Sequence, residues 1–344
     1  MSRRSLTLVI AGLATVATIA VAVLFPIPYV ILTPGPTLNT LGKDSSGQQL
    51  IKITGHPTYS TSGHLNLVTI SYQGGPGSDL NVFQALRAWL SPSEAVVPES
   101  ELFPSGQTAQ QTQAQDTEEM ASSQELATAA ALNQLHIKFQ TRVEVLSTLA
   151  GYPASKSLKA GDVIEAVDGK PVTSAASLSS MITSHPAGST LQIEVLRGGS
   201  TLTLPVASKE SNGTPVIGVN VQENYTFPFN VDITVGDIGG PSAGMMFALG
   251  IIDKLTTDNL AGGKFIAGTG EITSTGQVQP IGGIQQKMVG ARDAGATVFL
   301  TPAGNCSDTA GAVPAGLRIV KVSTLSQAVS DLEAIKAGKS VPSC

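Results

Sequence analysis

The chain has 344 residues, of which 42% are hydrophobic and 13% charged, and its formal net charge is −5. This length allows two domains of ordinary size, and the apolar content is sufficient for a buried core. The negative charge, the lack of basic clusters and the presence of only one Trp argue against a nucleic-acid-binding protein.

The N-terminal segment predicts a membrane anchor. Arg3 and Arg4 precede an uncharged stretch, and residues 6–25 form an apolar run long enough to cross a bilayer. A cleaved signal peptide is the alternative, with Ala20-Val21-Ala22 as a cleavage site, but the run exceeds the usual 7–15 residues of such peptides. The two arginines favour a cytoplasmic N-terminus, which would leave the bulk of the chain outside. We expect residues 1–42 to be an anchor followed by an extended connector.

Residues 43–136 show a mixture of strand and helix patterns. Apolar, β-branched runs at 50–53 and 65–72 predict strands, and residues 81–90 predict a helix. The polar residues 104–125 predict an exposed loop, which leads into a surface helix continuing through 127–135.

Residues 137–210 predict a compact, β-rich unit. Asp168-Gly169 and Gly198-Gly199 are hairpin signals, and residues 174–184 suit a short helix. With Tyr152-Pro153-Ala154 and the segment 158–162, the unit resembles a bacterial PDZ domain. The resemblance implies that peptide ends bind by adding a strand to a sheet edge. The Gly-Leu-Gly-Phe carboxylate loop of PDZ domains is not found, so no binding residue is carried over, and a purely structural role stays open.

The segment Gly240-Pro241-Ser242-Ala243-Gly244 suggests a nucleophilic serine at a helix start. Pro241 suits the first helical position, and the free N–H groups of a first turn can hold an oxyanion. A helix-capping serine is the alternative. An α/β-hydrolase elbow would need a histidine later in the chain. Every histidine precedes Ser242, so another base is required; they are His56, His64, His136 and His185.

Lys287 is the candidate base. Residues 284–294 predict a helix ending at Gly295, in which Ile284, Lys287, Met288 and Ala291 share one face. Burial with this apolar stripe would lower the lysine pKa towards neutrality, as a general base requires. The alternative is a lysine that reaches solvent from the edge of the stripe.

Together the two segments resemble the Lon-type Ser-Lys peptidases. The motif 237–244 looks like the serine motif of that family, and 268–273 with 276–287 is similar to its lysine motif. The resemblance implies Ser242 as nucleophile and Lys287 as base. It also implies Thr269 as a residue that helps to hold the lysine, with Gly240, Pro241 and Ala243 as supporting residues. The family often has an acidic residue three places before the serine, where this chain has Gly239.

The resemblance also implies the overall organisation. We expect an α+β protein in which a Lon-type domain, residues 43–136 and 211–344, is interrupted by the PDZ-like residues 137–210. The whole resembles the membrane-anchored, PDZ-containing Lon-like proteases of bacteria. It implies an ATP-independent endopeptidase that cleaves unfolded or flexible proteins outside the membrane, with the PDZ unit recruiting substrate. An inactive, membrane-tethered PDZ scaffold is the alternative, because of Gly239.

We expect neither a cofactor nor a metal. Gly338-Lys339-Ser340 ends like a phosphate loop, but Glu333 stands where the first glycine belongs. The Cys and His spacings suggest no metal site. Cys306 and Cys344 are either one disulfide or two free thiols. Physiological substrates, cleavage preference and homo-oligomer formation are left open by the sequence.

Overall fold

The computed structural model describes residues 3–43 and 46–344, which divide into two compact units. The first unit joins residues 1–137 to 229–344, and the second comprises 138–228. The expected PDZ-like boundary at 210 differs from this division, because the strand Val219–Thr226 pairs with Gln140–Thr148 of the second unit. Residues 211–228 therefore belong to the second unit and not to the C-terminal part of the first.

The first unit is built on a six-stranded mixed sheet in the order β18-β17-β14-β3-β1-β4. β14 runs parallel to both β3 and β17, whereas β1 is antiparallel to β3 and β4. The elements of this unit are α1 (Arg3–Leu24), β1 (Tyr29–Asn39), β2 (Ile51–Thr54), β3 (His64–Gly74), α2 (Val82–Trp89), β4 (Ala95–Pro98), α3 (Glu99–Leu102), α4 (Ala109–Gln134), β13 (Asn230–Ile233), α6 (Gly244–Leu255), β14 (Phe265–Gly268), β15 (Glu271–Ile272), β16 (Val278–Gln279), α7 (Ile284–Asp293), β17 (Val298–Pro302), η2 (Ala303–Asn305), α8 (Cys306–Thr309), β18 (Arg318–Val322) and α9 (Leu325–Lys336).

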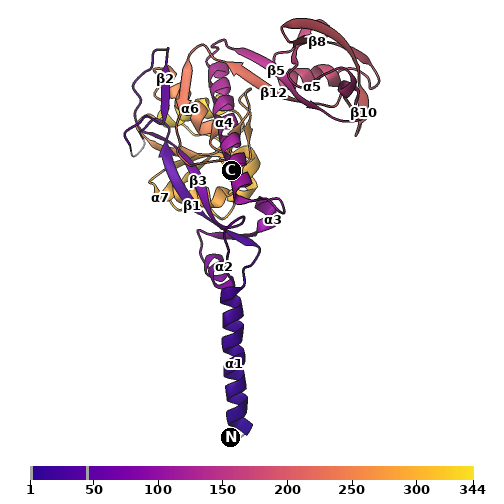
Figure 1. Ribbon diagram of the computed structural model, residues 1–344. Coiled ribbons are helices and arrows are strands. Elements are labelled where there is room, and N and C mark those ends of the chain that lie inside the picture. Colours follow the sequence, from indigo (N-terminus) through magenta and orange to yellow (C-terminus); the bar gives the residue numbers. More distant parts are fainter. Residues whose placement is uncertain (1–2, 44–45) are drawn as a thin grey trace. The chain divides into compact units, whose positions relative to one another are not determined.

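Helices α6 and α7 cover opposite faces of this sheet (Figure 1). Ala267 of β14 belongs to the same apolar cluster as Ile284 and Met288 of α7. The next residue, Gly268, points to the other face, where a Cβ atom would come within 2.7 Å of the Met246 sulfur of α6. This layering brings the residues that follow β14 between the two helices.

Helix α4 begins earlier than the polar composition of residues 104–125 indicated. Thr108 caps it, because its hydroxyl accepts the N–H of Gln111 while the Gln111 side chain accepts the N–H of Thr108. The prediction of a surface helix was also wrong for its C-terminal half. The run of small residues from Ala127 to Ala131 is buried, because α4 packs closely against α6. Figure 1 shows the two helices side by side.

The second unit is a curved sheet in the order β12-β5-β6-β8-β9, with α5 against it. Its elements are β5 (Gln140–Thr148), η1 (Pro153–Lys156), β6 (Val163–Val167), β7 (Lys170–Pro171), α5 (Ala175–Thr183), β8 (Thr190–Arg197), β9 (Ser200–Ala207), β10 (Lys209–Ser211), β11 (Thr214–Val216) and β12 (Val219–Thr226).

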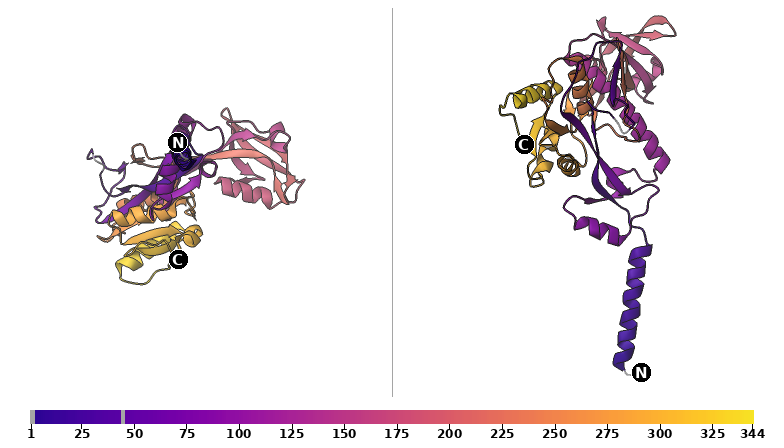
Figure 2. Two further views of the ribbon diagram at one scale, coloured as in Figure 1. Left: turned by 90° about the horizontal axis from the view of Figure 1, so that it is seen from below. Right: turned by 90° about the vertical axis from the view of Figure 1, so that its left-hand side faces the viewer.

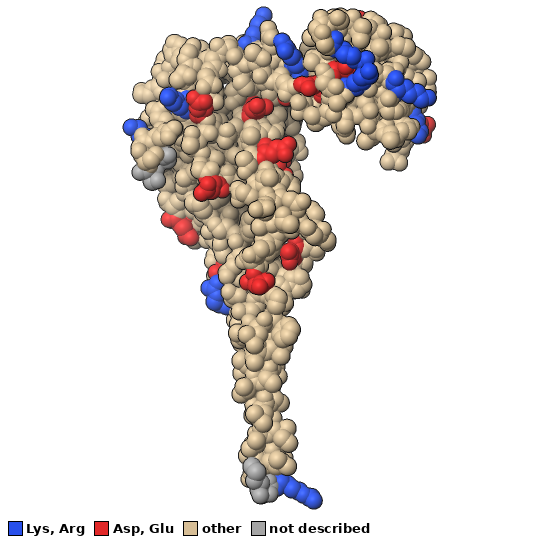
Figure 3. Space-filling model, viewed as in Figure 1, with Lys and Arg blue, Asp and Glu red and all other residues tan. Residues whose placement is uncertain are grey.

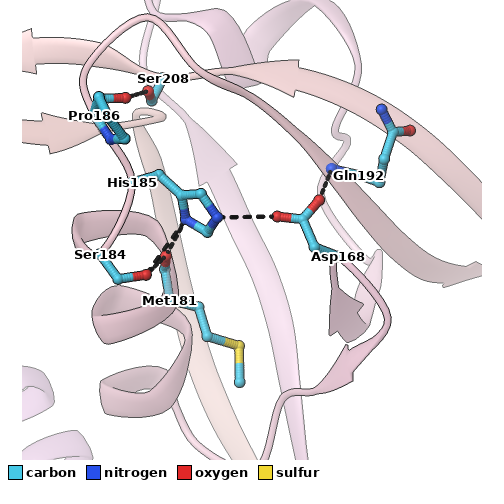
Figure 4. Close-up of polar contacts among 7 residues, drawn as sticks. All are labelled: Asp168, Met181, Ser184, His185, Pro186, Gln192 and Ser208. Carbon is cyan, nitrogen blue, oxygen red and sulfur yellow. Dashed lines mark hydrogen bonds and ion pairs between the residues drawn. The ribbon is translucent and has the colours of Figure 1, made fainter.

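The hairpin turn and the end of α5 in this unit are joined by polar contacts (Figure 4). Asp168 accepts the backbone N–H of Gln192 at 2.8 Å, and its other oxygen lies 3.5 Å from His185 Nε2. His185 Nδ1 lies 2.8 Å from the carbonyl of Met181 in the last turn of α5. The Asp168-Gly169 turn therefore also fixes the chain where it leaves α5.

Two features predicted at the chain ends can be placed. The disulfide alternative holds for Cys306 and Cys344, which are joined with their Cα atoms 5.2 Å apart. At the other end, α1 is long and apolar enough to cross a membrane, with none of its residues buried. A signal sequence would meet the same criterion.

Candidate functional site

The structure brings Ser242, Lys287 and Thr269 together between α6 and α7. Lys287 Nζ lies 2.7 Å from Ser242 Oγ and 3.2 Å from Thr269 Oγ1. Lys287 is 2% exposed and Thr269 is fully buried. As the sequence pattern predicted, α7 presents Lys287 on its buried face together with Ile284, Met288 and Ala291.

The amine of Lys287 is held in an environment that disfavours its charge. Burial lowers the pKa of Lys287 to about 7, although the nearby Glu271 carboxylate acts in the opposite direction. Burial and the charge of Glu119 in turn raise the pKa of Glu271. The direct polar partners of the Lys287 amine are hydroxyl groups, so the neutral form is accessible near neutral pH.

Ser242 lies just before α6 and not inside it. The helix begins at Gly244, so Pro241 is not its first residue as predicted. The reason is that the Ser242 carbonyl accepts the Gly270 N–H at 2.8 Å and the Thr269 hydroxyl at 2.9 Å, and is not used within the helix. Thr269 therefore contacts both the backbone of the serine and the amine of the lysine.

The backbone around Ser242 leaves hydrogen-bond donors available. Among the described residues, no acceptor is paired with the N–H of Ser242 or of Ala243. The neighbouring N–H of Gly240 donates to the Asp116 carbonyl at 3.0 Å, and the Pro241 carbonyl accepts the Ser123 hydroxyl at 2.9 Å. Helix α4 thus holds the loop before Ser242 in place while these two donors remain free.

Contact with α4 also accounts for the glycine at position 239. A Cβ atom at Gly239 would come within 2.5 Å of the Cβ atom of Asp116. An acidic residue there would therefore displace α4 or the loop. Asp116 itself lines the cleft around Ser242, where burial and then the charge of Glu119 raise its pKa. The sequence could not show this neighbour, because Asp116 is more than a hundred residues distant.

The cleft that leads to Ser242 is lined by several segments of the first unit besides α4. Residues 68–72 of β3 form one side, and the loop 237–243 forms another. Phe103 after α3 and the Ile281-Gly282 turn before α7 also line it. A strand and a turn beside the Ser242 hydroxyl offer backbone groups and apolar surface of the kind that an extended peptide can bind.

A second candidate site lies wholly within the second unit. A groove is bounded by α5 and by residues 214–221, with Leu178, Ile182 and Val221 among its apolar lining. β12 is the last strand of its sheet, so within the described part of the chain one of its edges has no neighbouring strand. Gly218 is required at the end of the groove, since a Cβ atom would come within 2.1 Å of Tyr152.

This groove differs from the prediction, in which residues 211–228 belong to the other unit. The run Val216-Ile217-Gly218-Val219, which leads into β12, could have indicated the groove. It is a glycine between apolar residues at the place where the groove ends.

Comparison with known proteins finds two families that match different parts of the chain. The model of the Lon protease (S16) C-terminal proteolytic domain matches residues 229–334, and that of the PDZ domain matches 113–207. The chain is a PDZ-containing relative of the Lon proteases. The PDZ match starts inside α4 and ends before β12, whereas the compact PDZ unit of this Lon-like chain comprises 138–228.

Individual relatives match only part of the chain. Lon protease 2 of Herpetosiphon aurantiacus is 46% identical over 94 residues, which is 27% of this chain. Lon protease of Syntrophomonas wolfei is 31% identical over 135 residues, or 37% of this chain. These matches cover 11% and 16% of the relatives' lengths. A PDZ domain of an SdrC-like protein from Listeria monocytogenes is 30% identical, covering 23% of this chain and 85% of that chain, with a TM-score of 0.22.

Proposed function

We propose that the chain is a serine endopeptidase in which Ser242 is the nucleophile and Lys287 the general base. The observation that carries this proposal is the 2.7 Å contact between Lys287 Nζ and Ser242 Oγ in a buried site. A serine becomes nucleophilic when a neighbouring base accepts its proton. A lysine whose pKa is lowered to about 7 can do so at neutral pH.

The proposed reaction uses these groups in order. Ser242 Oγ attacks the peptide carbonyl while its proton passes to the neutral amine of Lys287. The backbone N–H groups of Ser242 and Ala243 stabilise the negative oxygen of the tetrahedral intermediate. The protonated lysine then gives its proton to the leaving amine, and an acyl-enzyme remains. Water, deprotonated by Lys287, hydrolyses the ester and returns the serine.

We infer that Thr269 is a positioning residue in this reaction. Its hydroxyl can donate one hydrogen bond, which goes to the Ser242 carbonyl at 2.9 Å. Its oxygen then accepts from Lys287 Nζ at 3.2 Å. The arrangement directs an Nζ–H towards Thr269 and leaves the nitrogen lone pair for the serine proton.

The two segments of the first unit, residues 43–137 and 229–344, together form one Lon-type peptidase domain in this proposal, with the PDZ domain inserted between them. The division of the chain into compact units supports this organisation. The PDZ groove would recruit an extended apolar peptide by adding a strand to the free edge of β12. Substrates are unfolded or flexible proteins, and cleavage needs no ATP.

We further propose that α1 anchors the chain with its N-terminus in the cytoplasm and the remainder outside. Arg3 and Arg4 at the start of an otherwise uncharged helix support this orientation. Protease added to intact cells should digest the C-terminal part. Protection of that part until lysis would contradict this topology.

The rival proposal is an inactive, membrane-tethered PDZ scaffold, which Gly239 in place of an acid favours. Purified full-length chain in detergent should be incubated with a casein-like unfolded substrate, beside Ser242→Ala. We expect cleavage by the parent and none by the variant, with equal rates in the presence and absence of ATP and magnesium. Absence of cleavage by the folded parent would favour the scaffold, and a several-fold stimulation by ATP would refute ATP independence.

A further inference from the structure

Helix α2 carries an apolar face that has no partner among the described residues. The large side chains of this face share one side of the helix, since residues separated by three, four and seven positions are neighbours on it. Trp89 is 73% exposed and the adjoining Leu90 is 72% exposed. Beyond residue 25 the described residues include thirteen exposed large hydrophobic side chains, and five of them belong to this face: Val82, Phe83, Leu86, Trp89 and Leu90.

The opposite face of α2 is already used by the core. Ala88 is fully buried in a cluster with Leu80 and Ile31, and Ala85 packs against the same cluster. Arg87 lies between the two faces, where it reaches Glu94 at 3.4 Å with most of its side chain exposed. The outward apolar face is therefore additional to what folding requires, and its exposure is costly in water.

The start of α2 is held close to the end of α1. The N–H of Ile27 donates to the Leu80 carbonyl at 2.8 Å, and Ile27 is three residues beyond Leu24, the last residue of α1. Three residues extend over roughly 10 Å at most. Figures 1 and 2 show α2 beside the end of α1.

The dimensions of α1 place this junction at a membrane surface. Its 22 residues extend over about 33 Å, close to the thickness of a hydrocarbon core. Beyond the N-terminal end, no Lys, Arg, Asp or Glu lies along α1 (Figure 3). The remaining 10 Å leaves no room between α2 and the bilayer for a folded domain, whose diameter is about 30 Å. Lipid is therefore the occupant that this geometry favours over a protein partner.

We propose that α2 is an interfacial helix whose face formed by Val82, Phe83, Leu86, Trp89 and Leu90 enters the headgroup region of the membrane crossed by α1. This inference rests on the proposed anchor, but not on catalysis. Amphipathic helices bind in this way with their apolar side chains at the boundary between headgroups and acyl chains, where Trp is favoured. Because β4 and α3 follow α2 directly and Phe103 lines the cleft, a docked α2 would orient the cleft relative to the lipid surface.

Trp89 provides the test, because it is the only tryptophan of the chain. The full chain should be reconstituted in phosphatidylcholine–phosphatidylglycerol vesicles, with and without bromine on the upper part of the acyl chains. We expect blue-shifted Trp89 emission that brominated lipid quenches and aqueous acrylamide does not. The double variant Phe83→Asp, Leu86→Asp should lose bromolipid quenching and gain acrylamide quenching. Val313→Asp, at another exposed apolar residue, should resemble the parent.

Vesicle flotation on the same samples separates this inference from the anchor. If the chain floats with vesicles while acrylamide alone quenches Trp89, the interfacial helix is refuted and the anchor stands. A chain that does not float refutes both. Shielding of Trp89 that depends on protein concentration and is insensitive to bromolipid would identify a second copy as the occupant and refute the lipid. Casein cleavage by the same samples reports catalysis independently.

Discussion

Each of the two units buries an ionisable side chain, Asp162 in one and Lys287 in the other, and the surroundings of these two groups have opposite effects on their charge. In the PDZ unit, Asp162 is 1% exposed and accepts two hydrogen bonds from Arg197, at 2.6 and 2.7 Å. In the first unit, Lys287 is 2% exposed and its amine contacts two hydroxyl groups. Equal burial thus has different consequences, because one group has a partner of opposite charge in direct contact and the other does not.

The partners determine which protonation state each site favours. Hydrogen bonds from Arg197, together with the N–H of Lys159, hold the pKa of Asp162 below its usual range, so it stays charged. Burial lowers the pKa of Lys287 to about 7, so its neutral form is populated. A buried group that has a direct partner of opposite charge is held in its charged form, whereas a buried base without one is available for proton transfer.

The largest expected effect is loss of activity when Lys287 becomes an arginine. A guanidinium stays charged and cannot accept the Ser242 proton. We expect Lys287→Arg to reduce kcat/KM at least about 10³-fold, and Lys287→Ala with Ser242→Ala to be no worse than either alone, since the two groups act as one unit.

The control for this experiment is Lys254→Arg, which changes another buried lysine, 7% exposed, in the last turn of α6. Provided that circular dichroism shows both variants folded, only the change at Lys287 should abolish cleavage. Near-parental cleavage by folded Lys287→Arg would refute the dyad.

The next effect concerns the charge that does have a partner. Asp162→Ala removes three hydrogen bonds and leaves Arg197 without a carboxylate. We expect a loss of about 3 kcal/mol, the lower end for a broken buried pair, because Arg197 can turn to water. Hydrogen exchange of the amides in residues 138–228, recorded as the protein is heated, measures this loss in the free energy of unfolding.

The pH dependence of stability tests whether the Asp162–Arg197 pair causes this loss. The pKa of Asp162 is lowered by folding, so its stabilisation is present above about pH 3.9 and is lost as pH falls through the folded value. Parent and Asp162→Ala should therefore approach each other in stability at acid pH. A constant difference down to pH 2 would contradict the assignment.

A smaller effect is expected from pH on the activity of the parent. Because protonated Lys287 cannot act as a base, kcat/KM should fall about tenfold per pH unit below a pKa of about 7. Initial rates of peptide cleavage between pH 5 and 9 measure this. A single ionisation near 10 would show that the amine is not desolvated in solution.

The sequence predicted what depends on local pattern. The spacing of Ile284, Lys287 and Met288 is sufficient to place the lysine on the buried face of α7, and Gly295 to end that helix. It did not predict the contact of Asp116 with Gly239 or the pairing of β12 with β5. Both depend on residues that are far apart in the chain, and no periodicity in either segment reports its neighbour.

The start of α6 was predicted wrongly for a different reason. Pro241 and the apolar run after it have the composition of a helix from its first residue. The helix begins three residues later because the Ser242 carbonyl is bonded to Thr269 and Gly270, a tertiary contact that overrides local preference. The same contact positions the serine, so the error in the helix boundary and the geometry of the site have one cause.

The smallest expected effect is a gain in stability when Lys287 is replaced by methionine. The variant keeps a flexible chain of similar length and removes the amine that burial disfavours. The free energy of unfolding of the first unit, measured in urea, should therefore rise by on the order of 1–4 kcal/mol. This is the range in which hydrophobic replacement of buried charges stabilises proteins. Loss of the contacts with Ser242 and Thr269 should place the gain near the lower end.

The pH window of this gain has a definite sign. Between about pH 7 and 10.5 the unfolded parent binds a proton at Lys287 that the folded parent does not, so the stability of the parent rises with pH through this window. The advantage of Lys287→Met should therefore shrink from pH 7 to 10.5 and stay constant below 7. Lys264→Met, which changes an exposed lysine, is the matched control for the substitution itself. A Lys287→Met advantage that does not vary with pH would mean that Lys287 is charged in the folded protein, which would exclude it as the base.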